Sequence, residues 1–252
     1  MQVVFHERYR EVYACDPAAA YGRLDSMYDE LIKNYPFIRP EPASETDILL
    51  VHKTEHLERF KRNPQLFEVA SLAVGGSIKA SELAAGGEKA FGLIRPPGHH
   101  ASPGSCWGFC YFNNIAVAVE KLIKSSVIKK ALIVDIDLHF GDGTEKFFHG
   151  RSDAIYHHVT DKSREDFLND LKDFVESEKD YDIIGVSAGF DRHMSDWGRL
   201  LTTQDYTEAG RIISQSAGRV CQGKVFTVLE GGYNHNVLGL NAKALLSGLE
   251  QI

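Results

Sequence analysis

The sequence predicts an α/β fold, namely a single three-layer α/β/α domain with a mainly parallel central sheet. The first observation is a set of short apolar runs without polar alternation, which is typical of strands that are covered on both faces. The second is that segments with helical spacing separate these runs, as in successive βαβ units. The expected strands span residues 90–94, 131–138, 154–157, 183–188 and 224–229.

The expected helices lie between and around these strands. In the segment 113–124, the apolar residues Ile115, Val119 and Leu122 recur at helical spacing. The segment 67–85 is a longer helix rich in small residues. Further helices are expected over residues 18–34, 54–62 and 164–176. Because the 252 residues contain no repeat and no convincing linker, we expect one domain over residues 1–252.

The composition excludes several classes of protein. A formal net charge of −7 argues against direct nucleic-acid binding, which requires a basic surface. The N-terminus has no apolar segment of the kind found in signal peptides, and no apolar run is long enough to span a bilayer. Four cysteines in a chain of this length do not suggest a disulfide framework, so we expect reduced thiols in a cytoplasmic protein. The cysteines are Cys15, Cys106, Cys110 and Cys221.

Polar side chains follow several of the expected strands, and in a parallel sheet these strand ends share one edge where ligands bind. Asp135, Asp137 and His139 alternate along one strand and should project together. Asp191 follows another strand and would be a third ligand of the same metal ion, in addition to Asp137 and His139. Three nitrogen and oxygen ligands with an open fourth position describe a catalytic zinc site. The alternative, in which the aspartates only cap the following helices, suits a lone aspartate better than this convergent set.

The adjacent histidines His99 and His100 follow a rigid Pro-Pro-Gly turn. If the metal already has its ligands, these histidines are suited to proton transfer, since the ordinary imidazole pKa is about 6.5. Each would need a carboxylate to orient it, and Asp135 and Asp142 are the candidates. The alternative is a structural role for both histidines.

Two aromatic residues are further candidates. Tyr233 follows two glycines, which allow a side chain to approach a ligand closely, so its phenol could donate to a developing oxyanion. Packing at a strand end is the alternative for Tyr233. Phe109 could line a channel, although an isolated aromatic is more often part of the core.

Together these motifs resemble the histone deacetylase family of the arginase–deacetylase superfamily, which also includes acetylpolyamine amidohydrolases and bacterial acetoin-utilisation proteins. The resemblance runs in order along most of the chain and is closest to the class II and bacterial or archaeal branch. It implies the arginase–deacetylase fold and a metal-dependent deacetylase, a hydrolase of linear amide bonds. The motifs that carry it span residues 95–101, 108–114, 135–144, 187–191 and 229–234.

The resemblance also implies a role for each candidate. It makes Asp137, His139 and Asp191 the ligands of Zn²⁺, with Fe²⁺ as an alternative metal. His100 matches the general base and acid, with Asp142 behind it, and His99 matches an electrostatic helper paired with Asp135. Tyr233 matches the residue that polarises the acetyl carbonyl. Phe109 and Gly108 match the wall of the acyl-lysine channel.

A structural potassium site is implied as well, formed by Asp135 and by the backbone around Asp137 and His139. His158 stands where a serine commonly serves that site, so potassium binding there is an open question. Phe140 replaces the usual second histidine of a His-His-Gly-Asp motif, and we expect little effect from this change.

Two loops are shorter than in the family pattern. The segment 157–162 leads almost directly into the helix expected from residue 164, without the usual loop that carries a second channel aromatic. The rim loop before the 67–85 helix is reduced to Asn63-Pro64-Gln65. We therefore expect a more open mouth, unless a partner in a homo-oligomer fills it.

The substrate class is open between an acetyl-lysine protein, an acetylated polyamine and a small acetylated metabolite, because all three present the same amide. Two other functions compete with deacetylation. An arginase-like ureohydrolase would need a two-manganese ligand set, which suits the tandem histidines and the lone Asp191 less well. A zinc-binding acyl-ligand sensor would not need both His100 and Tyr233.

Overall fold

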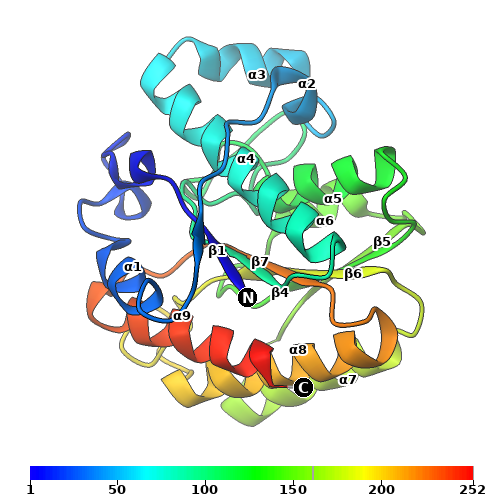
Figure 1. The fold of residues 1–252 in the computed structure, drawn as a ribbon. Helices are drawn as coiled ribbons and strands as arrows, with labels where there is room; N and C mark the ends of the chain where they lie inside the picture. Colours follow the sequence, from blue (N-terminus) through cyan, green and yellow to red (C-terminus); the bar gives the residue numbers. More distant parts are fainter. Residues whose placement is uncertain (161, 252) are drawn as a thin grey trace.

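A seven-stranded parallel sheet runs through the molecule with helices on both of its faces (Figure 1). The computed structural model describes residues 1–160 and 162–251. The strands lie in the order β2-β1-β3-β7-β6-β4-β5. Their bounds are β1 Gln2–Val4, β2 Phe37–Ile38, β3 Ala90–Gly92, β4 Ala131–Asp135, β5 Ala154–His158, β6 Ile183–Ala188 and β7 Val225–Leu229. The predicted three-layer α/β/α architecture is confirmed.

The helices form two layers around this sheet. Helices α4 and α5 cover one face, and α1, α7, α8 and α9 cover the other (Figure 1). The α-helices are α1 Asp25–Leu31, α2 Glu45–Ile48, α3 Thr54–Lys61, α4 Pro64–Ala85, α5 Asn114–Lys124, α6 Asp142–Phe148, α7 Arg164–Ser177, α8 Thr203–Val220 and α9 His235–Glu250. Two 3₁₀ turns, η1 Glu7–Arg10 and η2 Pro17–Ala19, lie near the N-terminus. Within the described residues, no helix is both long and apolar enough to cross a membrane.

The central strands are buried because helices cover both of their faces. Every residue of β4, β6 and β7 is buried, which explains why these strands are continuous apolar runs in the sequence. Helix α4 is buried along most of its length, and its small residues allow close approach to its neighbours. A Cβ atom at Gly75, for example, would lie 1.9 Å from the carbonyl oxygen of Glu41. The core therefore holds the strand ends, which carry the candidate site, in fixed positions.

The sequence predictions of helix and strand bounds needed four corrections. The helix expected over residues 67–85 begins at Pro64, so Pro64 and Gln65 of the expected rim loop belong to α4, and Asn63 is its N-cap. The helix expected over residues 18–34 is a 3₁₀ turn followed by the short helix α1, because Gly22 adopts a φ of +75° between them. The strand expected over 131–138 ends at Asp135, whose carboxylate accepts a hydrogen bond from the Asp137 backbone N–H and turns the chain. The strand expected over 90–94 ends at Gly92, shortly before the cis peptide bond between Arg95 and Pro96.

His52 makes stability sensitive to acid, because it is buried and joins two segments of the chain. Its Nε2 accepts a hydrogen bond from the Asn113 backbone N–H at 2.8 Å, and its Nδ1 lies 3.1 Å from the Ser102 carbonyl oxygen. Burial, with a smaller contribution from neighbouring His56, lowers the pKa of His52 from 6.5 to about 3. The folded state thus favours the neutral ring, whereas the unfolded chain takes up a proton below the ordinary pKa.

We predict that this residue lowers the free energy of unfolding as the pH falls from about 6.5 towards 3, by up to about 1.4 kcal/mol per pH unit. Urea unfolding of the wild type and of His52→Gln between about pH 7 and pH 4 measures the effect, since the difference removes the titration of all other groups. The stability difference between the two proteins should change with pH. Parallel curves would show that His52 has the same pKa in the folded and the unfolded protein, which would contradict the prediction.

Candidate active site

The candidate residues meet at the carboxyl ends of the central strands, where the loops after β3, β4, β6 and β7 converge. The loop after β3 carries His99 and His100, and the loop after β4 carries Asp137 and His139. Asp191 follows β6, and Tyr233 follows β7. The sheet order places β6 between β4 and β7, with β3 next to β7. Because all of these strands are parallel, their polar ends lie at one edge. The structure therefore brings together the residues that the sequence analysis selected.

Asp137, His139 and Asp191 form a compact group of potential metal ligands. One donor atom from each of them lies within 4.8 Å of the other two. His139 Nδ1 is 3.3 Å from Asp137 Oδ1 and 3.1 Å from Asp191 Oδ2. Both aspartates are fully buried and His139 is partly exposed, so the group faces an opening on one side.

The surroundings of these three residues fit a cation. Asp191 Oδ2 is buried and accepts no hydrogen bond within the described part of the chain. A Cβ at Gly231 would lie 2.6 Å from both Asp137 Oδ2 and Asp191 Oδ2, so a glycine there keeps the carboxylates accessible. A hydrogen bond to Asp137 and the nearby carboxylate of Asp191 raise the pKa of His139 to about 10, so the two carboxylates favour a positive charge at this position. A nitrogen and two carboxylates are donors suited to zinc or ferrous iron.

Each of the two tandem histidines has its own carboxylate partner. His99 Nδ1 lies 2.9 Å from Asp135 Oδ2, and His100 Nδ1 lies 2.8 Å from Asp142 Oδ1. Spacing along the sequence left open which carboxylate orients which histidine. The structure pairs His99 with Asp135 and His100 with Asp142, which is the pairing that the family resemblance implies. In both residues the Nδ1 atom is engaged, which leaves Nε2 to face other groups.

The two histidines differ in their expected protonation. Burial alone would lower the pKa of His99, but the carboxylates of Asp135 and Asp137 outweigh it and raise that pKa well above its ordinary value. Burial, together with the neighbouring His99, lowers the pKa of His100 to about 4. His100 is therefore neutral and able to accept a proton near neutral pH, whereas His99 carries charge.

Asp135 organises the start of the β4 loop and does not belong to the metal-ligand group. Its Oδ1 accepts from the Asp137 backbone N–H, and its Oδ2 accepts from the Tyr156 hydroxyl at 2.9 Å in addition to bonding His99. Sequence alternation grouped Asp135 with Asp137 and His139 on one face. Because the strand ends at Asp135, the following residues leave the regular alternation, and only Asp137 and His139 join Asp191.

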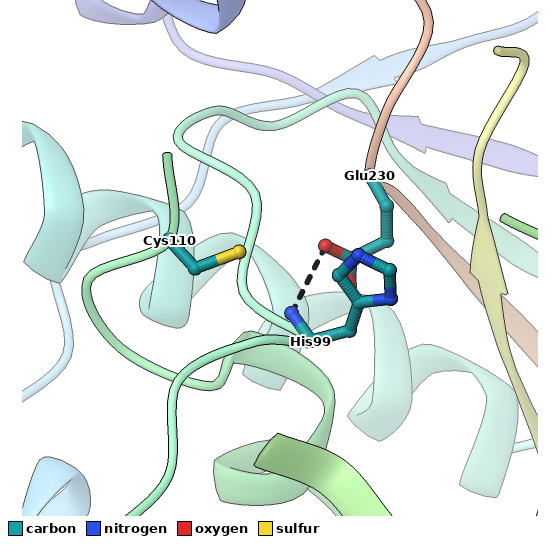
Figure 2. Close-up of side chains that lie close together, drawn as sticks. All are labelled: His99, Cys110 and Glu230. Carbon is teal, nitrogen blue, oxygen red and sulfur yellow. Dashed lines mark hydrogen bonds between the residues drawn. The ribbon is translucent and has the colours of Figure 1, made fainter. Parts of the chain in front are cut away.

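Glu230 holds the backbone of the loop that carries His99 and His100. Its buried carboxylate accepts hydrogen bonds from the backbone N–H groups of Gly98 at 2.6 Å and His99 at 3.2 Å. Figure 2 shows this carboxylate together with the His99 ring and the Cys110 thiol. Burial raises the pKa of Glu230 to about 7. The sequence patterns did not predict this role, although a glutamate directly before Gly231-Gly232 at a strand end is a signal that could have indicated it.

A cavity of about 320 Å³ opens over these groups. Tyr233 and Phe109 lie on its wall, with ring centroids 6.0 Å apart in an edge-to-face arrangement. Gly108 has a φ of +58°, and a Cβ there would lie 2.4 Å from the His100 ring, so this position requires glycine. The cavity is lined by Pro97, His99, His100, Trp107, Gly108, Phe109, His139, Trp197, Gly231 and Tyr233.

Two tryptophans that the sequence analysis did not select flank the opening. The Trp107 ring lies over the His100 ring, with centroids 3.8 Å apart and planes tilted by 34°, and its indole N–H donates to the Asp142 carboxylate at 3.0 Å. Trp197 stacks on the Tyr233 ring at 4.0 Å. Both tryptophans are about half exposed, and a wider hollow of about 850 Å³ adjoins the cavity at Trp197. Neither residue lies in a strand-end motif, so sequence spacing alone gave no reason to choose it.

Comparisons with known proteins agree with this geometry. The chain is 30% identical over 268 residues to a probable deacetylase of Methanothermobacter thermautotrophicus, covering 85% of this chain and 79% of that protein. It is 28% identical to a probable deacetylase of Archaeoglobus fulgidus, with 92% of this chain and 81% of that protein covered. A histone deacetylase-like amidohydrolase of Pseudomonas aeruginosa is 37% identical over 131 residues, or 45% of this chain and 34% of that protein.

The solved structures and the family models extend the agreement to the whole fold. The crystal structure of the HDA15 HD domain superposes with a TM-score of 0.83 at 23% identity, covering 98% of this chain and 88% of that one. The model of the histone deacetylase domain matches residues 17–167 and 156–249. The chain therefore belongs to the histone deacetylase domain family.

Proposed function

We propose that this protein is a zinc-dependent amidohydrolase that removes acetyl groups from N-acetylated amines. One observation carries the proposal: three metal donors lie beside two histidine–carboxylate pairs, and these histidines line one cavity together with Tyr233. Metal-assisted amide hydrolysis needs a Lewis acid, a base for the attacking water and a donor for the oxyanion. Together, these residues can supply all three.

Asp137, His139 and Asp191 would hold the zinc ion, and their donor set would also accept ferrous iron. When bound, the metal supplies Lewis acidity to the acetyl carbonyl and to the attacking water. Every other contribution comes from side chains of the protein. Phe109 and Gly108 would contact the acyl chain in the cavity.

His100 would act as the general base and then as the general acid. Its Nδ1 bonds to Asp142, so the free Nε2 is the atom that accepts the water proton and returns it to the leaving amine. Its lowered pKa keeps this nitrogen unprotonated at neutral pH. The charged His99, held by Asp135, would stabilise negative charge that develops nearby.

Tyr233 would donate its hydroxyl hydrogen to the oxyanion of the tetrahedral intermediate. Burial raises the pKa of this phenol far above its ordinary value, so it stays protonated and able to donate. Its ring is held between Trp197 and Phe109, which limits the directions in which the hydroxyl can point. Such preorganisation is what makes an oxyanion donor effective.

An acetate-release assay with three substrates tests the proposal and selects among substrate classes. The substrates are an acetyl-lysine peptide, an acetylpolyamine and free acetyl-lysine, each added to zinc-loaded protein and to a chelated sample. We expect chelator-sensitive release from at least one of them. If zinc stays bound at one equivalent and no substrate releases acetate, the alternative of a zinc-binding acyl-ligand sensor replaces deacetylation.

Trp107 should influence the rate by positioning His100 and Asp142. The Trp107→Phe variant keeps an aromatic ring over His100 but deletes the indole N–H that bonds to Asp142. Since a hydrogen bond to a charged group is worth about 1.5 kcal/mol, we predict a loss in kcat of about tenfold. KM should change little, and Trp107→Ala should lose more than Trp107→Phe. A variant with unchanged kcat and a raised KM would instead identify Trp107 as a substrate contact.

The cellular setting follows as a further proposal. All four cysteines are free, as expected in a reducing compartment, and we propose a cytoplasmic protein that acts on acetylated small molecules or acetyl-lysine proteins. A homo-oligomer in which a partner narrows the cavity is part of the same proposal. That residues 1–252 form one catalytic domain is likewise proposed, and limited proteolysis without an internal cut would support it.

A further inference from the structure

The family resemblance implies a structural potassium ion beside the metal centre. The structure shows which protein groups bond to the oxygens that would hold this ion. The expected ligands are the Asp135 carboxylate and backbone carbonyls around Asp137 and His139. Both oxygens of Asp135 already accept hydrogen bonds from the protein. Two backbone carbonyls of this loop, those of Ile136 and Asp137, also have a partner, which is the side chain of Arg192.

Arg192 is a fully buried arginine that follows the candidate ligand Asp191. Its Nε donates to the carbonyl oxygens of Asp137 at 2.9 Å and Ile136 at 3.2 Å. Its Nη2 donates to the Val159 carbonyl oxygen at 2.7 Å and to His158 Nε2 at 3.1 Å. One guanidinium thus binds the loop after β4 and the end of β5 at the same time.

The acceptors around Arg192 are those that a monovalent cation would need. Carbonyl oxygens carry partial negative charge, and a guanidinium satisfies them with fixed N–H groups while contributing one positive charge. His158 can only accept this hydrogen bond through an unprotonated Nε2, and burial lowers its pKa in agreement with a neutral ring. The Phe167 ring lies 5.3 Å from the guanidinium carbon and adds a favourable cation–π contact.

A potassium ion at these carbonyls would therefore meet a second positive charge and oxygens that are already bonded. Desolvated like charges at such short range repel strongly, and potassium would have to displace the guanidinium to bind. His158 offers a nitrogen where the family pattern places a serine hydroxyl, which further weakens an oxygen cage for potassium. The residues present do not fit the ion that the resemblance implies.

We propose that the Arg192 guanidinium is a built-in replacement for the structural potassium ion, so that the protein neither binds nor requires a monovalent cation near Asp135. The guanidinium ties the backbone of Asp137 to the end of β5 and thereby holds the metal-ligand loop in place. This inference rests on family membership, not on the proposed deacetylase activity, because it concerns the stability of the loop.

Thermal unfolding and acetate release, measured while KCl replaces choline chloride at an ionic strength of about 0.15 M, test the proposal. The wild type should show the same Tm and the same rate throughout. A saturable rise of either quantity with potassium would overturn the proposal. The Tm readout stays decisive even if the protein turns over none of the substrates, so failure of this inference is separable from failure of the proposed function.

The Arg192→Ala variant provides the second arm. Loss of the guanidinium exposes carbonyls that a cation can then reach, so we expect a Tm lower by more than about 5 °C that potassium or millimolar guanidinium partly restores. Arg95→Ala is the matched control, because Arg95 is also buried and donates to the carbonyls of Glu11 and Ala20, in a different segment. Potassium should not raise its Tm. Equal recovery of both variants by potassium would contradict a specific site, and if Arg192→Ala fails to fold, the wild-type titration alone decides.

Discussion

Replacing Asp191 with asparagine should abolish stoichiometric zinc binding and lower kcat by at least about 10³-fold. Asp191 Oδ2 is buried, accepts no hydrogen bond within the described residues and lies 3.1 Å from His139 Nδ1. Burial and the neighbouring Asp137 raise the pKa of Asp191 to about 6, which reflects the unfavourable burial of two negative charges that a bound cation would offset. An amide of the same shape cannot provide that charge.

Metal content by elemental analysis and turnover of the same sample measure the effect. Asp182→Asn is a matched control, because Asp182 lies just before β6 whereas Asp191 lies just after it, and its carboxylate bonds only to backbone N–H groups of Lys129 and Lys130 among the described residues. The control should keep one zinc per chain and normal turnover. An Asp191→Asn protein that retains both zinc and activity would remove Asp191 from the ligand set.

Replacing Tyr233 with phenylalanine should lower kcat by about 10²- to 10³-fold while zinc content and KM stay nearly unchanged. The phenol lies on the wall of the cavity with His99, His100 and His139, and its ring is fixed by stacking on Trp197. Deleting the hydroxyl removes a donor that matters mainly when the oxyanion forms, so the loss belongs to the chemical step.

Steady-state kinetics on Tyr233→Phe separate this role from substrate binding. Tyr206→Phe serves as the control, since Tyr206 is a buried tyrosine of α8 whose hydroxyl has no hydrogen-bond partner within the described residues. It should retain wild-type kcat. A Tyr233→Phe enzyme that loses affinity but keeps kcat would reassign the hydroxyl to substrate binding, and normal kinetics would remove it from the mechanism.

The sequence predicted the central sheet and the grouping of the candidate ligands because both depend on local patterns. Buried parallel strands are continuous apolar runs, and the candidate ligands follow them directly, so Asp137, His139 and Asp191 could be grouped before their positions were known. Strands β1 and β2 have only three and two residues, which is too short for a recognisable pattern. The long helices α8 and α9 lie outside the motifs and were not delimited.

The remaining features depend on contacts between distant segments. Trp107 reaches His100 and Asp142 through a loop with positive φ at Gly108 and Phe109, which no periodicity reveals. Arg192 satisfies carbonyls more than thirty residues away in the sequence, and only the fold brings them together. The sequence indicated that the potassium site was altered at His158, but the compensating arginine required the structure.

The central claim is that a metal held by Asp137, His139 and Asp191 drives removal of an acetyl group, and a zinc titration tests it most directly. Protein stripped with a chelator is titrated with Zn²⁺ while acetate and free amine are measured from the same acetylated substrate. We predict no turnover without zinc, a linear rise to a plateau at one zinc per chain, and equal amounts of acetate and amine. Turnover that is independent of zinc, or one bound zinc without release of either product, would contradict the account.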